Sequence, residues 1–212
     1  DEMNKIDIIL STLDSMFPNA HVELDHQSHF QLLVAVALSA QTTDKAVNKV
    51  TPALFHQFPD AYALSKADVD EVKPFIQSIG LYHNKAKNII ALAKELVEKF
   101  HGDVPSDRAS LEALPGVGRK TANVVLSNAF NIPALAVDTH VDRVSKRLRL
   151  AKKTDSVLVV EQKLMKKFPK EHWTKLHHQL IFFGRYHCTA KNPQCNTCPL
   201  YDMCVYPKKT KN

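Results

Sequence analysis

Hydrophobic side chains recur along this chain with the spacing of helices that bury one face. In residues 83–100, Ile89 and Leu96 fall on one side, with lysines and glutamates on the other. Residues 4–17 show the same period. Residues 29–40 are apolar almost throughout, rich in Leu and Ala, and lack Gly and Pro, which favours a helix over a strand. Each of these three segments is therefore predicted to be a helix.

Capping residues and helix-breaking residues mark further elements. One helix is expected from Thr42 or Thr43 to Pro59, followed by short helical pieces over 60–78 that Pro74 interrupts. A helix over 107–113 is expected to have Ser106 as its cap. Further helices are expected from Lys120 to Asn131, from Asp138 or Thr139 onward, and over 155–168 and 172–187. In the helix after Asp138, we expect the apolar positions to face inward and the basic residues to face outward. No segment has the pattern of a β-strand, so the predicted fold class is all-α.

The predicted helices divide into two groups at a hinge around Pro133. One helical domain is expected over residues 21–132, and the second from residues 1–20 together with 133–212. A chain of 212 residues is long enough for one large core or two small domains. The longest apolar run, Leu32–Leu38, is far too short to span a bilayer, and the acidic, polar first residues do not resemble a signal peptide.

The net charge of +6 and the isoelectric point of about 9.1 favour a polyanionic partner. Six basic residues fall within eleven positions: Arg143, Lys146, Arg147, Arg149, Lys152 and Lys153. Three more follow near the C-terminus: Lys208, Lys209 and Lys211. A solvated helix face explains such a run equally well, so charge alone leaves the partner open.

The chain has only five glycines, and two of them, Gly116 and Gly118, stand one residue apart. Glycine adopts backbone angles that other residues avoid and has no Cβ, so another chain can approach it closely. A tight turn here would present consecutive N–H groups at the beginning of the next helix, which is an anion-binding arrangement. A plain helix–helix turn is the alternative, and Arg119 and Lys120 favour phosphate binding.

Lys120 and Asp138 are the candidate reactive side chains. The positive partial charge of a helix N-terminus disfavours a protonated amine, so a lysine in a first turn can be a nucleophile that forms Schiff bases. A phosphate contact or a solvated helix residue is an equal alternative for Lys120. Asp138 either caps the next helix or stands opposite Lys120 as a carboxylate, and one side chain can do both.

The final 25 residues contain all four cysteines, in the spacing C-x6-C-x2-C-x5-C: Cys188, Cys195, Cys198 and Cys204. A [4Fe–4S] cluster accepts four thiolates from one compact loop. A structural zinc site more often has two close cysteine pairs, and two disulfides need an oxidising compartment, but both stay open. A cluster would act as a staple for a tail too poor in apolar residues to fold unaided.

These motifs resemble the helix-hairpin-helix superfamily of DNA glycosylases. Leu114–Lys120 is similar to that superfamily's hairpin, within a helix-hairpin-helix of about residues 107–130, and Asp138 stands at the position of its aspartate. Four further segments, besides the cysteine spacing, resemble the bacterial endonuclease III family: Ser39–Asp44, Gly80–Tyr82, Val137–Val141 and Gly184–Tyr186. The similarity covers nearly the whole chain.

The resemblance implies two helical domains flanking a DNA-binding cleft, with a C-terminal loop whose four cysteines hold one [4Fe–4S] cluster. It implies a bifunctional DNA N-glycosylase and AP lyase that removes oxidised or ring-damaged pyrimidines from duplex DNA. The family's nucleophilic lysine, which forms a Schiff base before β-elimination of the 3′ phosphate, falls on Lys120. The family's acid falls on Asp138.

The resemblance also implies a set of DNA contacts. Gln41 and Leu81 match the positions that fill the space left by the extruded nucleotide and wedge the duplex, although a helix-cap neighbour and a core leucine are simpler interpretations. Further contacts are expected at Gly116, Val117, Gly118, Arg119, Asp44, His140 and Lys191. The loop that contains Lys191 is less basic than in relatives, which predicts a smaller share in DNA binding.

The implied partner is double-stranded DNA with damaged pyrimidines or abasic sites, bound by a monomer in the bacterial cytoplasm and at the nucleoid, with no membrane partner. Three alternatives remain to be weighed. A monofunctional glycosylase of the superfamily typically lacks the lysine, so Lys120 argues against it. Lys120 and Asp138 together argue against a non-catalytic DNA-binding module with a metal staple. An electron-transfer protein is disfavoured because no flavin or nicotinamide fingerprint accompanies the cysteines.

Overall fold

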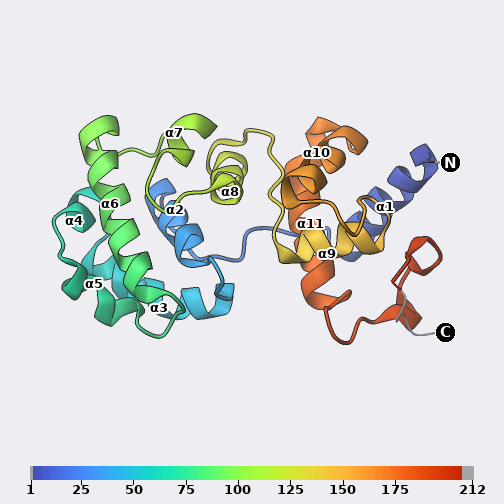
Figure 1. The fold of residues 1–212 in the computed structure, drawn as a ribbon, viewed down its shortest axis with the longest axis horizontal. Coiled ribbons are helices and arrows are strands. Elements are labelled where there is room, and N and C mark those ends of the chain that lie inside the picture. The colour runs from blue at the N-terminus through green and yellow to red at the C-terminus, as the bar shows by residue number, and fades with distance from the viewer. Residues whose placement is uncertain (1, 207–212) are drawn as a thin grey trace. The chain divides into compact units, whose positions relative to one another are not determined.

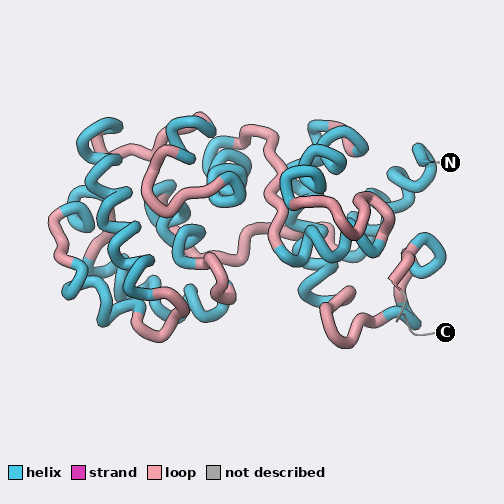
Figure 2. The backbone as a smooth tube through the Cα atoms, in the orientation of Figure 1, coloured by secondary structure: helices cyan, strands magenta, loops and turns pink. Residues whose placement is uncertain are grey.

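The computed structural model describes the backbone of residues 2–206 and the side chains of residues 4–206. The three C-terminal lysines of the basic segment, Lys208, Lys209 and Lys211, lie outside the described residues. Within the described part, every regular element is a helix and none is a strand, so the all-α prediction is confirmed (Figure 2). None of the described helices is both long and apolar enough to cross a membrane.

Contacts along the chain form two compact units. We call Glu23–Ile132 the hairpin unit, and Asp1–Val22 together with Pro133–Asn212 the cysteine unit. The first segment of the chain therefore belongs to the cysteine unit, the middle segment forms the whole hairpin unit, and the segment from Pro133 onward belongs to the cysteine unit again.

The hairpin unit is built from seven helices along one continuous stretch of chain. They are α2 (His29–Leu38), α3 (Asp44–Gln57), α4 (Ala61–Ser65), α5 (Val69–Ile76), α6 (Tyr82–Phe100), α7 (Arg108–Glu112) and α8 (Arg119–Phe130). The long α6 packs against α4 and α5, and α2 packs against α8 (Figure 1). The buried face of α6 includes Ile89, Leu92 and Leu96, which is the apolar stripe read from the sequence.

Two local expectations for this unit are wrong. Asp107, not Ser106, caps α7, because the Asp107 carboxylate accepts a hydrogen bond from the Ser110 N–H at 2.9 Å. Pro74 lies inside α5 and does not interrupt the helical pieces. The break falls before Asp68, whose capping box with Glu71 starts a new helix.

The cysteine unit joins the first helix of the chain to the last part of the sequence. Its α-helices are α1 (Glu2–Met16), α9 (Thr139–Arg147), α10 (Val157–Lys167) and α11 (Trp173–Tyr186). Short 3-10 helices lie at Lys170–His172, Cys195–Thr197 and Tyr201–Met203. Val141, Val144 and Leu148 are buried in a core with residues of α1 and α11, so their predicted inward orientation is confirmed.

The buried His178 of α11 should make folding of the cysteine unit sensitive to mild acid. Burial, with a smaller effect of His21, lowers the pKa of His178 from 6.5 to about 4. The unfolded chain therefore takes up a proton that the folded chain refuses between pH 6.5 and about pH 4. Above that pH window, His178 does not reduce the free energy of unfolding. As the pH decreases through the window, the free energy of unfolding falls by at most about 3 kcal/mol because of this group.

The measurement is the free energy of urea unfolding at pH 7 and at pH 4.5. The loss on acidification should be about 1–3 kcal/mol smaller in His178→Gln, which has no proton to take up, than in the wild type. Equal losses in both proteins would show that His178 does not control the acid sensitivity.

Candidate functional site

The glycine turn between α7 and α8 is anchored by buried side chains. Leu114 and Val117 are buried, and the Val117 N–H donates to the Leu114 carbonyl at 3.1 Å. Gly118 is the N-cap residue of α8 and supplies no side-chain acceptor to the first turn of the helix. The positive end of α8 is therefore left without a side-chain cap, which is the condition for binding an anion.

Only one of the two glycines uses backbone angles closed to other residues, so that expectation is wrong for Gly118. Gly116 has a φ of +75°, and a Cβ there would lie 2.9 Å from the Cβ of Asn88 on α6. Gly118 has a φ of −97°, and a Cβ there would meet nothing within 4 Å. The turn requires Gly116, whereas Gly118 leaves open space at the helix N-terminus.

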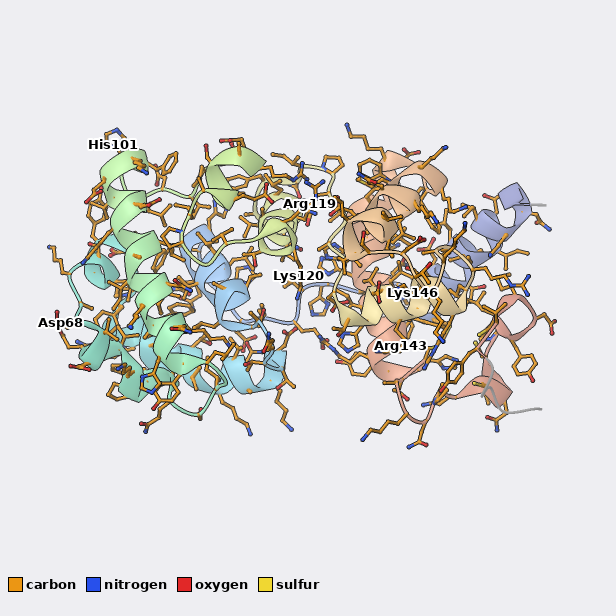
Figure 3. All side chains as sticks on the ribbon, in the orientation of Figure 1. Asp68, His101, Arg119, Lys120, Arg143 and Lys146 are labelled. Atoms are coloured by element: carbon orange, nitrogen blue, oxygen red, sulfur yellow. The ribbon has the colours of Figure 1, made fainter. Side chains whose placement is uncertain are left out.

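Arg119 and Lys120 are the first two residues of α8 (Figure 3). The Lys120 side chain is exposed, and Arg119 is half-buried. Within the hairpin unit, Lys120 is therefore accessible to solvent.

Two loops of the hairpin unit hold Gln41 and Leu81 in the left-handed region of backbone space. Their φ angles are 55° and 60°, where an L-residue carries a steric cost of about 1–2 kcal/mol. Both residues are exposed, and Leu81 leaves 54% of its surface accessible, so its interpretation as a core leucine is wrong. Such strained conformations concentrate at binding sites, which favours a role for both in contacting a partner.

These two loops lie side by side. A Cβ on Gly80 would be 3.7 Å from Thr42 Oγ1 and 3.8 Å from the Gln41 carbonyl oxygen. Lys85, in the first turns of α6, donates to Thr42 Oγ1 at 2.8 Å. Because α6 also contacts the glycine turn through Asn88, one helix carries both loops and the turn.

Lys85 is a further residue of this region that is not among the candidates predicted from the sequence, although the sequence carries a signal for it. Lys85 stands four residues before Ile89 and seven before Leu92, which places it on the apolar stripe of α6. The structure leaves it only 6% exposed, and burial lowers its pKa. A lysine on a buried stripe is uncommon unless it has a partner.

Asp44 and Lys191, two further candidates, lie in different units. Asp44 is half-buried and is the first residue of α3, whose cap is Thr43 and not Thr42. Lys191 is exposed in the loop between Cys188 and Cys195.

Asp138 is the N-cap residue of α9, so the capping interpretation is confirmed. Its Oδ1 accepts a hydrogen bond from the Val141 N–H at 2.8 Å, and its Oδ2 lies 3.0 Å from His140 Nδ1. The Asp138 side chain is 12% exposed and that of His140 is 27% exposed. The helix that Asp138 caps therefore holds its carboxylate in one orientation, with a small accessible edge.

The four cysteines line one cavity of the cysteine unit, beside Leu148 and Phe183. None of these four cysteines forms a disulfide. Among the described residues, no three His, Cys, Asp or Glu side chains are close enough together to hold a single metal ion. A [4Fe–4S] cluster fills the space between its thiolates, so its ligands stand farther apart than those of one zinc ion. Four thiolates that line one cavity are the donor set that such a cluster uses.

Two arginines of α9 turn toward this segment, so the expectation that the basic residues of α9 face outward is wrong for both. Arg147 is 8% exposed and donates to the Thr189 carbonyl at 2.9 Å and to Cys188 Sγ at 3.2 Å. Arg143 donates to a backbone carbonyl of α11 at 2.6 Å. Burial raises the pKa of the Cys188 thiol, and Arg147 opposes that shift. The arginines bind the cysteine segment to the helix that Asp138 caps.

Comparison with known proteins gives matches over most of the chain. Residues 34–170 match the family model of the HhH-GPD superfamily base excision DNA repair proteins, and residues 188–204 match that of the iron-sulfur binding domain of endonuclease III. The chain is 54% identical to endonuclease III of Bacillus subtilis (strain 168) over 202 residues, which are 95% of this chain and 92% of that protein. It is 48% identical to endonuclease III of Escherichia coli (strain K12) over 201 residues, 95% of each protein.

Solved structures agree with these matches. A trapped endonuclease III–DNA covalent intermediate, in an estranged-adenine complex, is 54% identical with a TM-score of 0.93, over 96% of this chain and 95% of that chain. A thermostable thymine-DNA glycosylase has a TM-score of 0.87 at 23% identity, over 99% of this chain and 100% of that chain, and shows the shared fold alone.

An all-helical chain with a glycine hairpin and a four-cysteine cluster site defines a base excision repair glycosylase. Within the HhH-GPD superfamily, this chain belongs to the endonuclease III family. It is a DNA glycosylase and AP lyase that acts on DNA with damaged bases. It carries a [4Fe–4S] cluster, so the cluster prediction is confirmed over zinc and over disulfides.

Alanine substitutions at the two glycines should separate folding from DNA binding. Gly116→Ala forces a left-handed angle on alanine and a clash with Asn88, so the variant should lose about 1–2 kcal/mol of stability in urea unfolding. Gly118→Ala should unfold like the wild type, because its angle and space accept a methyl group. That methyl occupies the space at the helix N-terminus, so affinity for duplex DNA in fluorescence anisotropy should fall about tenfold. Wild-type affinity in Gly118→Ala would contradict phosphate binding at this point.

Proposed function

We propose that Lys120 is the nucleophile and Asp138 the carboxylate of the glycosylase and lyase reaction, and that the substrates are oxidised or ring-damaged pyrimidines in duplex DNA. The observation that carries the proposal is the pair of helix N-termini. One displays the exposed Lys120 amine, and the other holds the Asp138 carboxylate in one orientation. The similar endonuclease III that was trapped as a covalent intermediate with DNA supports covalent chemistry.

The reaction begins when the damaged nucleotide leaves the duplex, at lower cost because lesions stack and pair poorly. The unprotonated Nζ of Lys120 attacks C1′ of the sugar, and the bond from C1′ to the base breaks. The base leaves with the electron pair of that bond and takes up a proton. The Asp138 carboxylate stabilises the positive charge that develops at C1′.

The lyase step follows from the covalent intermediate. The C1′–O4′ bond of the sugar ring then breaks, O4′ takes up one of the protons of Nζ, and C1′ and Nζ form an iminium, which acidifies the hydrogen on C2′. Removal of that proton forms a C2′–C3′ double bond and expels the 3′ phosphate oxygen. Water then releases Lys120 from the sugar.

The remaining site residues hold and open the duplex in this proposal. Gly116, Val117, Gly118 and Arg119 form one contact with a backbone phosphate, in which Val117 fixes the turn, because its side chain is buried and its N–H donates to the Leu114 carbonyl. Gln41 and Leu81 fill the space left by the flipped nucleotide. Both side chains are exposed, and both residues have backbone angles in the left-handed region. Asp44 and His140 line the substrate site, and Lys191 contacts a phosphate.

Cys188, Cys195, Cys198 and Cys204 would hold the cluster, which supplies a covalent cross-link for the C-terminal loop and no reacting group. Arg147 and Arg143 bind the backbone of this loop, so α9 and the cysteine segment form one body. We place this protein in the bacterial cytoplasm, at the nucleoid, as a monomer on duplex DNA. The named relatives are bacterial.

Borohydride should trap the wild-type protein covalently on duplex DNA with a damaged pyrimidine, because it reduces the iminium. Lys120→Gln should give no trapped product and should cleave at least about 10³-fold more slowly, while it binds the same DNA within about threefold in anisotropy. Lys94→Gln, an exposed lysine on α6, is the matched control and should react like the wild type. Trapping by Lys120→Gln would assign the nucleophile to another residue.

Asp138→Asn is the companion variant. Asparagine caps helices about as well as aspartate, so the stability should change little. Loss of the negative charge should slow base release on the order of 10²–10⁴-fold. A wild-type rate in this variant would remove Asp138 from the chemistry.

Substrate preference is tested with a panel of duplexes, each with one defined lesion at one position. Single-turnover rates of base release should be highest for oxidised and ring-saturated pyrimidines, at least about 10²-fold above those for damaged purines. Abasic duplexes should be cleaved without a glycosylase step. Equal rates on purine and pyrimidine lesions would overturn the assigned substrate class while leaving the lysine mechanism intact.

A further inference from the structure

The cysteine unit contains a second basic site, outside the residues assigned to the DNA reaction. A cavity of about 1070 Å³ lies among α1, the C-terminal end of α9, and α10. Its described lining includes seven lysines and arginines, and Asp7 is the one acidic side chain among them. Lys146 of α9 belongs to this lining (Figure 3) and stands eight residues beyond Asp138, or about 12 Å along the helix.

Two ion pairs with acidic side chains are found along this lining in the described part of the chain. Lys146 pairs with Asp142 at 3.1 Å, and Lys163 pairs with Asp155. Exposed cations add to the lining: Arg149, Lys152, Lys153 and Lys166. Cations that share one concave surface raise its positive potential, and an anionic ligand would relieve their repulsion.

The backbone at Arg149 is strained, with a φ of 61° in a residue that is not glycine. The turn after α9 therefore keeps an arginine where glycine would fit more easily. This angle ends α9 as a Schellman motif, in which the Leu150 N–H donates to the Ser145 carbonyl at 2.8 Å and the Arg149 N–H donates to the Lys146 carbonyl at 3.3 Å.

The floor of the cavity is aliphatic. Ile6, Leu150 and Ala151 belong to the buried core, and Pro169 and Val205 complete the apolar surface. The described lining contains no Phe, Tyr or Trp on which a nucleobase would stack. A DNA backbone would use the cations and leave the aliphatic floor without a partner. The cavity therefore suits a ligand with both carboxylates and an aliphatic side chain.

We propose that this cavity binds an acidic peptide segment of a partner protein, with an aliphatic anchor residue on the floor and aspartates or glutamates against the lysines and Arg149. Recognition of acidic motifs by clustered basic side chains is a common mode of peptide binding. The proposal does not depend on the roles assigned to Lys120 and Asp138.

The test uses the full-length holoprotein and a fluorescein-labelled peptide, Asp-Asp-Asp-Leu-Leu, followed by anisotropy. Binding of the peptide should saturate, with a dissociation constant below about 1 mM. A peptide with serine in place of both leucines should bind at least about fivefold more weakly, because it loses the apolar anchor.

Two double variants with the same change in net charge separate the site from general electrostatics. Lys152→Glu with Lys166→Glu should weaken peptide binding at least about tenfold and leave cleavage of damaged duplex unchanged. Lys66→Glu with Lys94→Glu, exposed lysines of the hairpin unit, should leave both unchanged.

Arg149→Gly is a variant in which a loss of peptide affinity cannot be attributed to unfolding. Glycine accepts a φ of 61°, so the unfolding midpoint should equal or exceed that of the wild type. Peptide affinity should nevertheless fall at least about threefold. Wild-type affinity in this variant would remove Arg149 from the site.

Three results would overturn the proposal. The first is no binding of the peptide to the wild type. The second is equal weakening by both double variants, which would show an effect of net charge only. The third is loss of damaged-duplex binding in the Lys152→Glu, Lys166→Glu protein with unchanged peptide affinity, which would make the cavity a nucleic-acid surface.

Discussion

The N–H groups at the beginnings of two helices organise this protein for its reaction. The first N–H groups of any helix have no acceptor within the helix. At α9, the Asp138 carboxylate accepts the Val141 N–H at 2.8 Å, and the same bond orients the carboxylate. At α8, the cap residue Gly118 has no side-chain acceptor, and Lys120 follows as the second helical residue. The first turn of α9 thus has an acid as its cap, and the first turn of α8 has no side-chain cap and is followed by an amine.

In each unit a buried charged side chain joins two segments that are far apart in the sequence. In the hairpin unit, Lys85 joins α6 to the loop of Gln41, so the two strained loops and the glycine turn share one rigid support. In the cysteine unit, Arg147 joins α9 to the loop of the cluster ligands. Each charge is buried next to hydrogen-bond acceptors, which offsets the cost of removing it from water. These buried charges therefore position segments next to the residues that we propose for the reaction.

Patterns confined to a few neighbouring residues could be interpreted without the structure. The apolar period located the helices, and the cap at Asp138 depends on an N–H only three residues away. Local signals failed where they were ambiguous. Ser106 and Asp107 are both good caps, and the carboxylate of Asp107 is the one that reaches the Ser110 N–H. The composition of the turn also could not reveal that Gly116 needs its left-handed angle while Gly118 does not.

The sequence by itself determined the all-α class, the hairpin followed by Lys120, the cap at Asp138 and the four-cysteine set, because each is a short-range pattern of residue types. The tertiary structure alone decided which charged side chains are buried and which gather on one surface. Lys85 and Thr42 are 43 positions apart, and Arg147 and Cys188 are 41 apart. Burial of a charge depends on acceptors that only folding brings within reach, and so does the basic cavity, whose lining comes from four separate parts of the chain.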